Sequence, residues 1–216
     1  MTTETHEQAT RSRAACYRYL SGCYCLPEGE FLSPDDLAGF GGVLAAIGSE
    51  AADKPQAMAE TLEATEQDEM RIEYSRLFVG PFKLPAPPYG SVYLDDGRRL
   101  MGDSTIDVVR RYREAGVDVD PVQEDVPDHI AIELEFMAYL VHMQEEATTA
   151  GDSDALRDAL DKQIGFLERH LCAWVPEFAT NVRAESESAF YTDLADATET
   201  FLAEDLARVR TEWDQL

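Results

Sequence analysis

The sequence predicts an all-α protein that folds as one helical bundle. Apolar residues recur at steps of three and four positions along most of the chain, as at Ala14, Tyr17, Leu20 and Tyr24. Alternation of apolar and polar residues never runs longer than a few positions, so no strand is expected. With 216 residues, 44% of them hydrophobic, the chain can bury a full core. We therefore expect a single domain over residues 1–216, with about eight helices and a long proline-rich loop.

Helix start signals divide the first third of the chain. A helix is expected over about residues 10–24. Ser33 followed by Pro34 predicts an N-cap with proline at the first helical position. Another helix is expected to begin near Pro55. The segment Thr65–Asp68 resembles a capping box and opens the next helix.

The middle of the chain is expected to be a loop. Four prolines between positions 81 and 88 lack amide donors and favour extended neighbours. No helix is therefore expected between Pro81 and about Asp103. Asp103 or Ser104 then caps a helix that ends at Gly116.

The longest helix is expected from about Pro127 to Ala150. Apolar residues line more than one of its faces, which is typical of a helix at the centre of a bundle. Asp152 or Ser153 is expected to cap the next helix, and Pro176 to break the chain again. A last helix spans roughly Ser188–Trp213.

The charge balance narrows the classes of partner. The chain holds 43 acidic and 18 basic residues, a formal net charge of -25. Nucleic acids and anionic membrane surfaces both require basic patches, so neither is expected as a partner. Basic partners are favoured, although an excess of acid also serves solubility alone.

The sequence also predicts a cytoplasmic protein without stable membrane insertion. Its polar N-terminus has no apolar stretch of a signal peptide, and no window is apolar over the length of a bilayer. The four cysteines form no CxxC pair, and reduced thiols are expected. The roles of Cys16, Cys23 and Cys25 are left unassigned.

A bipartite motif is the most informative feature of the chain. Its first part, Glu73–Tyr93, joins the end of a helix to a rigid loop that is rich in proline and aromatic residues. Rigid aromatic side chains suit peptide recognition because they lose little entropy on binding. An ordered loop packed over the bundle is the alternative.

The second part of the motif, Pro127–Met137, carries an adjacent Asp128 and His129. If Pro127 fixes the first helical turn, Asp128 lies where free amides favour an anion, and His129 shares a helix face with Glu133. These residues then offer a polar contact for a ligand. A cap at Asp128 and a pair between His129 and Glu133 would be purely structural alternatives.

The sequence gives little support to a catalytic site or a metal site. A dimetal bundle needs Glu-x-x-His on two helices, and neither His142 nor His170 has a glutamate three residues earlier. A hydrolase triad through Ser91 would lack an oxyanion hole. Phosphate-binding loops are absent from the sequence as well. No catalytic residue, metal or cofactor is therefore expected.

The segments EYSRLFVG, APPYGSVY and PDHIAIELEFM, in this order, resemble the TorD/DmsD/NarJ family of redox-enzyme maturation chaperones, with the TorD/DmsD branch closest. The resemblance implies a cytoplasmic chaperone for a molybdopterin-dependent oxidoreductase of the dimethyl-sulfoxide-reductase type. Such a chaperone binds the twin-arginine leader peptide and the apo-molybdoenzyme, and delays export until the cofactor is inserted. Tyr89 stands where a tryptophan is frequent in the family, and the client stays unnamed.

Carried over by motif, the resemblance implies a leader-binding surface and two acidic residues for electrostatic support. Glu73 and Glu133 are the two acidic residues. The leader-binding surface comprises Leu77, Phe78, Pro87, Pro88, Tyr89, Ser91, Tyr93, Asp128 and His129.

Two other functions stay open at this point. One is a nucleotide-binding or nucleotide-hydrolysing enzyme, against which the missing phosphate-binding loop weighs. The other is a stable assembly subunit of a membrane reductase. A monomer and a helix-swapped homodimer are equally compatible with the sequence.

Overall fold

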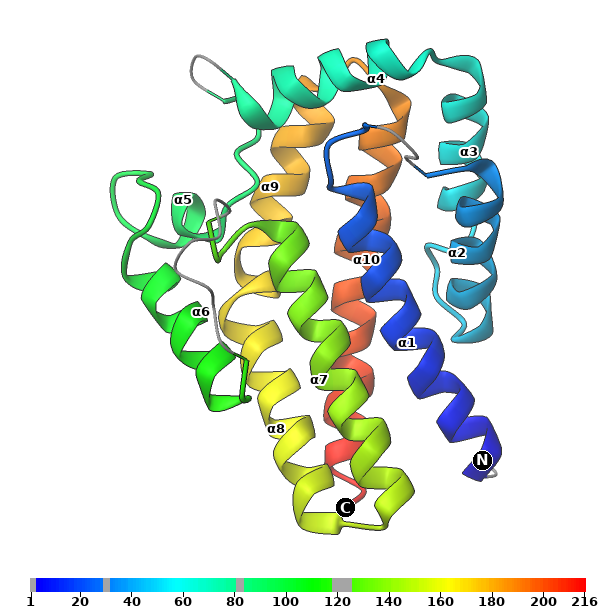
Figure 1. Ribbon diagram of the computed structural model, residues 1–216, viewed down its shortest axis with the longest axis vertical. Helices are drawn as coiled ribbons and strands as arrows, with labels where there is room; N and C mark the ends of the chain where they lie inside the picture. Colours follow the sequence, from blue (N-terminus) through cyan, green and yellow to red (C-terminus); the bar gives the residue numbers. More distant parts are fainter. Residues whose placement is uncertain (1–2, 29–31, 81–83, 118–125) are drawn as a thin grey trace.

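The computed structural model describes residues 3–28, 32–80, 84–117 and 126–216, which form a bundle of helices (Figure 1). The predicted all-α class is confirmed; that the whole chain is one domain stays a prediction. Along the described residues the elements are α1 (Thr3–Cys23), α2 (Pro34–Ala46), α3 (Lys54–Ala64), α4 (Gln67–Tyr74), the π-helical η1 (Ser75–Val79), α5 (Gly90–Leu94), α6 (Asp103–Glu114), α7 (Ile130–Ala150), α8 (Ser153–Arg169), α9 (Leu171–Glu185) and α10 (Ala189–Trp213).

Helices α1, α7, α8 and α10 run along the long axis of the molecule (Figure 1). α1 packs against α7 and α2, while α10 packs against α3, α8 and α9. α4 crosses one end of the bundle, and α5 and α6 lie together on one side. Among the described helices, none combines the length and the apolar character that spanning a bilayer requires.

Two predicted caps are confirmed. Ser33 caps α2 in a capping box with Asp36, and Pro34 occupies the first turn. The Asp152 carboxylate accepts hydrogen bonds from two amides at the start of α8. Gly151 ends α7 with φ of 67°, a left-handed conformation that glycine adopts without steric cost.

Two other predicted caps are wrong. Glu66, not Thr65, stands at the N-cap of α4, and the Thr65 hydroxyl donates instead to the Thr61 carbonyl at 2.8 Å. Neither Asp103 nor Ser104 caps α6. The Asp95 carboxylate does so from the preceding loop, because it accepts the Ser104 amide at 3.2 Å and the Ser104 hydroxyl at 2.8 Å.

Three helix boundaries that were predicted from proline positions are wrong. The loop expected from Pro81, a residue outside the described part, contains the short helix α5. The helix expected from Pro127 begins at Ile130, and with 21 residues it is shorter than α10, which has 25. Pro176 lies inside α9 and does not break it. Burial of Trp174, Val175 and Phe178 holds α9 together around the missing amide.

A buried polar network joins α1, α7, α8 and α10. Arg13 makes a two-pronged ion pair with Asp205, at 2.6 and 3.0 Å, and also donates to Gln144 and Gln163. The Tyr17 hydroxyl donates to Asp205 at 2.8 Å. Burial disfavours the charged Asp205 carboxylate, but Arg13 and Tyr17 outweigh burial and hold its pKa below the usual value. Each charge in this network has its partners inside the core.

Replacing Arg13 with alanine should destabilise the protein strongly, because the buried Asp205 would lose its two-pronged ion pair and keep only Arg208, at 3.2 Å, and the Tyr17 hydroxyl as partners. We expect the free energy of unfolding to fall by about 3–5 kcal/mol. Denaturant unfolding followed by circular dichroism measures the change. Arg18→Ala is the matched control, since Arg18 lies exposed on the same helix; its change should stay within about 0.5 kcal/mol. Similar losses in both variants would contradict this account of the network.

Candidate functional site

The two parts of the bipartite motif lie side by side. Tyr89 and His129 form an isolated antiparallel bridge. The Gly90 amide donates to the Asp128 carbonyl, and the Ile130 amide donates to the Pro88 carbonyl, both at 2.9 Å. The loop before α5 is thereby paired with the chain that enters α7, and segments almost forty positions apart form one local structure.

The Asp128 side chain stabilises this pairing of the two segments, which we call the junction, from inside the protein. Its carboxylate accepts the Ser91 amide at 2.6 Å and the Thr105 hydroxyl at 3.1 Å. Asp128 and Ser91 are fully buried. One carboxylate therefore caps the start of α5 and binds α6, while its backbone leads into α7. The prediction that Asp128 lies in the first turn of its own helix is wrong, because His129 is the N-cap of α7.

Glu133 lies beneath the junction. Its Oε2 accepts the Trp174 indole N–H at 3.0 Å, while Oε1 has no hydrogen-bond partner among the described residues. Burial raises the pKa of Glu133 well above its ordinary value and so favours the neutral form of the side chain. The pair expected between His129 and Glu133 does not form between these side chains. His129 Nδ1 accepts the Ala131 amide instead, at 3.2 Å.

Glu73 is fully engaged at the other end of the motif. Arg76 donates to both of its oxygens, at 2.7 and 2.8 Å, and the Glu187 amide donates at 2.8 Å. Burial disfavours the charge, but these donors hold the pKa of Glu73 below its usual value. Glu73 thus ties α4 to the link between α9 and α10.

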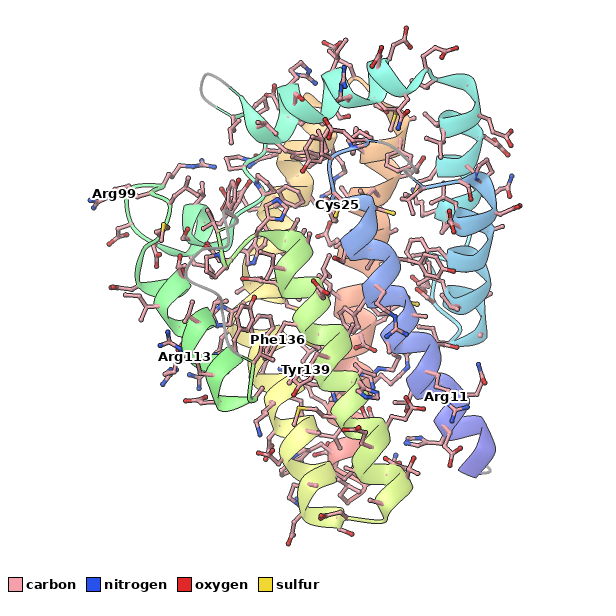
Figure 2. The ribbon with its side chains drawn as sticks, viewed as in Figure 1. Arg11, Cys25, Arg99, Arg113, Phe136 and Tyr139 are labelled. Carbon is pink, nitrogen blue, oxygen red and sulfur yellow. The ribbon has the colours of Figure 1, made fainter. Side chains whose placement is uncertain are left out.

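A cleft of about 490 Å³ opens beside the Tyr89–His129 bridge. We call it the motif cleft. It lies between the end of α1, the π-helical turn η1 and the start of α7. Its lining is Ser21, Tyr24, Cys25, Leu26, Tyr74, Phe78, Val79, Tyr89, Val126, His129, Ala131, Ile132 and Glu135. Cys25, which belongs to this lining, lies just beyond the end of α1 (Figure 2). The lining is mostly apolar and aromatic, with few polar groups, as in many ligand sites.

The structure brings only part of the predicted surface into the motif cleft. Phe78, Tyr89 and His129 line it. The remaining predicted residues lie behind it or beside it: Pro87 and Tyr93 are half-buried, and Leu77, Pro88, Ser91 and Asp128 are buried. Tyr93 stacks on Trp174 with ring centroids 5.4 Å apart. These residues shape the walls rather than the opening.

Sequence reasoning missed several residues of the cleft. Val79 is 60% exposed although it ends a helical run, and Leu26 is 38% exposed. Glu135, on the exposed side of α7, makes no ion pair with any described residue. Tyr24 and Tyr74 fit an ordinary core stripe, and nothing in their spacing marks a cleft. The exposure of apolar Val79 beside Phe78 becomes informative only when the fold is known.

Cysteine and acidic residues do not converge on a metal site in the described part of the chain. Cys16 and Cys23 are buried in the core, and burial raises the pKa of the Cys16 thiol to about 12. A neutral buried thiol packs as a small apolar side chain.

The chain is similar to known maturation proteins. Residues 45–180, well over half of the chain, match the sequence model of the nitrate reductase delta subunit family. The Chaperone protein TorD of Vibrio parahaemolyticus is 27% identical over 65% of this chain and 64% of its own. The Tat proofreading chaperone DmsD of Salmonella typhi is 31% identical over 61% of this chain and 57% of its own. The chain thus spans less than two thirds of these relatives' length.

A solved structure shares the fold. The crystal structure of a redox enzyme maturation protein from Archaeoglobus fulgidus aligns with a TM-score of 0.54 and 23% identity, over 88% of this chain and 93% of that one. At this identity the likeness shows the fold alone. The resemblance carried by the sequence motifs is confirmed by the family match and the named relatives.

Replacing Asp128 with alanine should loosen the junction between α5, α6 and α7. The Ser91 amide and the Thr105 hydroxyl would lose a charged acceptor inside the protein, so we expect a loss of about 3 kcal/mol in the free energy of unfolding. Asp96→Ala, at an exposed position in the next loop, is the control and should change stability by less than about 0.5 kcal/mol. Denaturant unfolding measures both, and equal effects would contradict the junction role.

Replacing Glu133 with glutamine should stabilise the protein increasingly as the pH rises. Because the pKa of Glu133 is raised in the folded state, the unfolded chain releases the proton first, above about pH 4.3. The wild-type protein therefore loses stability relative to the variant from about that pH upward. Unfolding free energies at pH 4 and pH 8 test this. A difference that stays constant with pH would show that the pKa of Glu133 is not raised in the folded protein.

Proposed function

This chain belongs to the nitrate reductase delta subunit family, and on that premise we propose that it is a chaperone for redox-enzyme maturation. Its client is the apo form of a molybdopterin-dependent oxidoreductase that carries a twin-arginine leader peptide. The chaperone binds the leader and delays export until the cofactor is inserted. It works in the cytoplasm, where the leader is still attached, and performs no covalent chemistry.

The observation that carries this proposal is the motif cleft. The two segments of the motif are paired through Tyr89 and His129, and both residues line one opening with Phe78. An apolar, aromatic cleft on a rigid frame favours binding of an extended or helical peptide, because few side chains have to be ordered. The apolar part of the leader fits this lining.

The charge of the protein suits the other part of the leader. A twin-arginine leader begins with a cationic segment ahead of its apolar stretch. Glu135 lies exposed at the rim of the motif cleft and can accept a guanidinium group. Glu133 is buried and accepts the Trp174 indole N–H, so it supports Trp174 from below. The net charge of -25 steers a cationic leader toward the protein.

Calorimetry with a synthetic peptide tests the proposal. The peptide carries two consecutive arginines followed by an apolar stretch, and a second peptide has both arginines replaced by lysines. We expect Tyr89→Ala to weaken binding of the arginine peptide roughly tenfold through lost aromatic contact. Glu135→Gln should weaken it about threefold, and the effect should shrink when salt is added.

Glu63→Gln is the control, because it removes an equal charge at an exposed site on α3, away from the motif cleft. It should leave the dissociation constant unchanged. The proposal fails if the wild-type protein does not bind the arginine peptide, or if Tyr89→Ala and Glu135→Gln both bind it like the wild type.

A further inference from the structure

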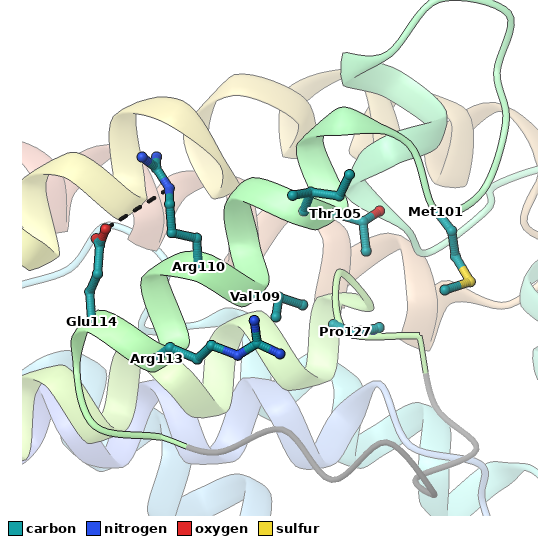
Figure 3. Close-up of a pocket in the computed structure, with 8 residues that line it drawn as sticks. Met101, Thr105, Val109, Arg110, Arg113, Glu114 and Pro127 are labelled. Carbon is teal, nitrogen blue, oxygen red and sulfur yellow. Dashed lines mark ion pairs between the residues drawn. The ribbon is translucent and has the colours of Figure 1, made fainter.

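A second surface lies on the outer side of α6, and Pro127, which lines it, directly follows Val126 of the motif cleft in the chain. We call it the α6 patch and define it by Met101, Ile106, Val109, Arg110 and Arg113. These residues line a pocket of about 560 Å³, together with Thr105, Glu114 and Pro127 (Figure 3). Met101 and Ile106 are 67% and 68% exposed.

The apolar side chains of the α6 patch have no part in the core. α6 already packs inward through Thr105, Val108 and Tyr112. The centroids of the Tyr112 and Phe136 rings are 4.5 Å apart. Ile106 and Met101 face solvent instead, and Leu100 beside them is 49% exposed. Single exposed apolar residues are ordinary, but a cluster around a pocket is typical of an interaction site.

The charge around the α6 patch is opposite to that of the protein. Five of the 18 basic residues lie between positions 98 and 114, against three carboxylates, although the whole chain carries a charge of -25. Figure 2 shows Arg99 and Arg113 on the outer edge of the molecule.

Arg113 differs from the neighbouring arginines. Arg111 is held by Asp107 at 2.8 Å, and Arg110 pairs with Asp107 and Glu114. Arg113, which is exposed, makes no ion pair with any residue of the described ranges. Its guanidinium lies on the wall of the pocket and is available to a carboxylate from outside.

We propose that the α6 patch binds an acidic segment of a partner protein, one in which carboxylates flank an apolar side chain. The apolar side chain enters the pocket between Met101, Ile106 and Val109, and a carboxylate pairs with Arg113. The twin-arginine leader cannot be the occupant, because its charge is positive. An anionic bilayer shares the charge but not the shape: a pocket receives a side chain, whereas a bilayer is bound by protruding groups, and the remaining acidic surface repels it.

Fluorescence anisotropy with the full chain and three labelled peptides of about fourteen residues tests the proposal. The first peptide carries glutamates around leucines at helical spacing, the second lysines for the glutamates, and the third serines for the leucines. We expect saturable binding of the first peptide alone. Arg113→Glu should weaken it roughly fivefold, and Ile106→Ser roughly tenfold.

Two controls match these variants in chemistry and exposure. Arg18→Glu reverses a charge on an exposed position of α1, and Ile72→Ser removes an isoleucine that is 67% exposed on α4. Both should bind the first peptide like the wild type. Since Ile106 and Arg113 are exposed, all four variants should keep the circular dichroism spectrum and unfolding midpoint of the wild type.

Five results would overturn the proposal. The first peptide shows no saturable binding up to about 1 mM, or the lysine peptide binds equally well. The control variants weaken binding as much as the patch variants. Anionic lipid vesicles sediment the protein and Ile106→Ser releases it, which would make the patch a membrane contact. Sedimentation velocity shows a dimer that Ile106→Ser or Arg113→Glu dissociates, which would make it an interface between two copies of this chain.

Discussion

The buried Asp128 carboxylate is the constraint on which the arrangement of the motif depends. It satisfies the Ser91 amide at the start of α5 and the Thr105 hydroxyl on α6, while its backbone carbonyl accepts the Gly90 amide. A charge taken out of water is tolerated only with such donors, so the carboxylate fixes all three segments at once. Tyr89 and His129 face the motif cleft because the residues next to them are held by this one side chain.

The residues beneath the loop restrict its sequence as well. Gly90 lies over Trp174 and Glu133, and a Cβ atom there would come within 3.1 Å of the indole nitrogen and 3.3 Å of the Glu133 carboxyl. Glycine therefore allows the loop to lie against the bundle. Glu133, whose pKa is raised by burial, accepts the indole N–H from below. The rigidity that peptide binding needs thus comes from beneath the cleft and not from the residues at its opening.

Local sequence patterns predicted the helices well and the motif junction poorly. The period of apolar residues and the caps at Ser33 and Asp152 depend on neighbours in the chain, and these predictions are confirmed. Asp128 also stands just before a helix, which predicts a cap for that helix. It caps α5 instead, because the fold brings α5 to it. Glu133 also has a partner that its neighbours in the chain do not reveal. Its four-residue spacing from His129 predicts a surface pair, but its carboxyl group accepts a hydrogen bond from Trp174 on α9 instead.

The distribution of charge links the two proposed surfaces. A uniformly acidic protein would attract any cation and repel acidic segments everywhere. Here the motif cleft carries an exposed carboxylate at Glu135, whereas the α6 patch carries Arg113, which forms no ion pair within the described residues, beside apolar side chains. Asp128 binds Thr105 of α6 and leads directly to His129 of the cleft, so the two surfaces share one rigid junction. A client with a cationic leader and an acidic segment elsewhere could therefore meet both surfaces without competition between them, since each repels the charge that the other attracts.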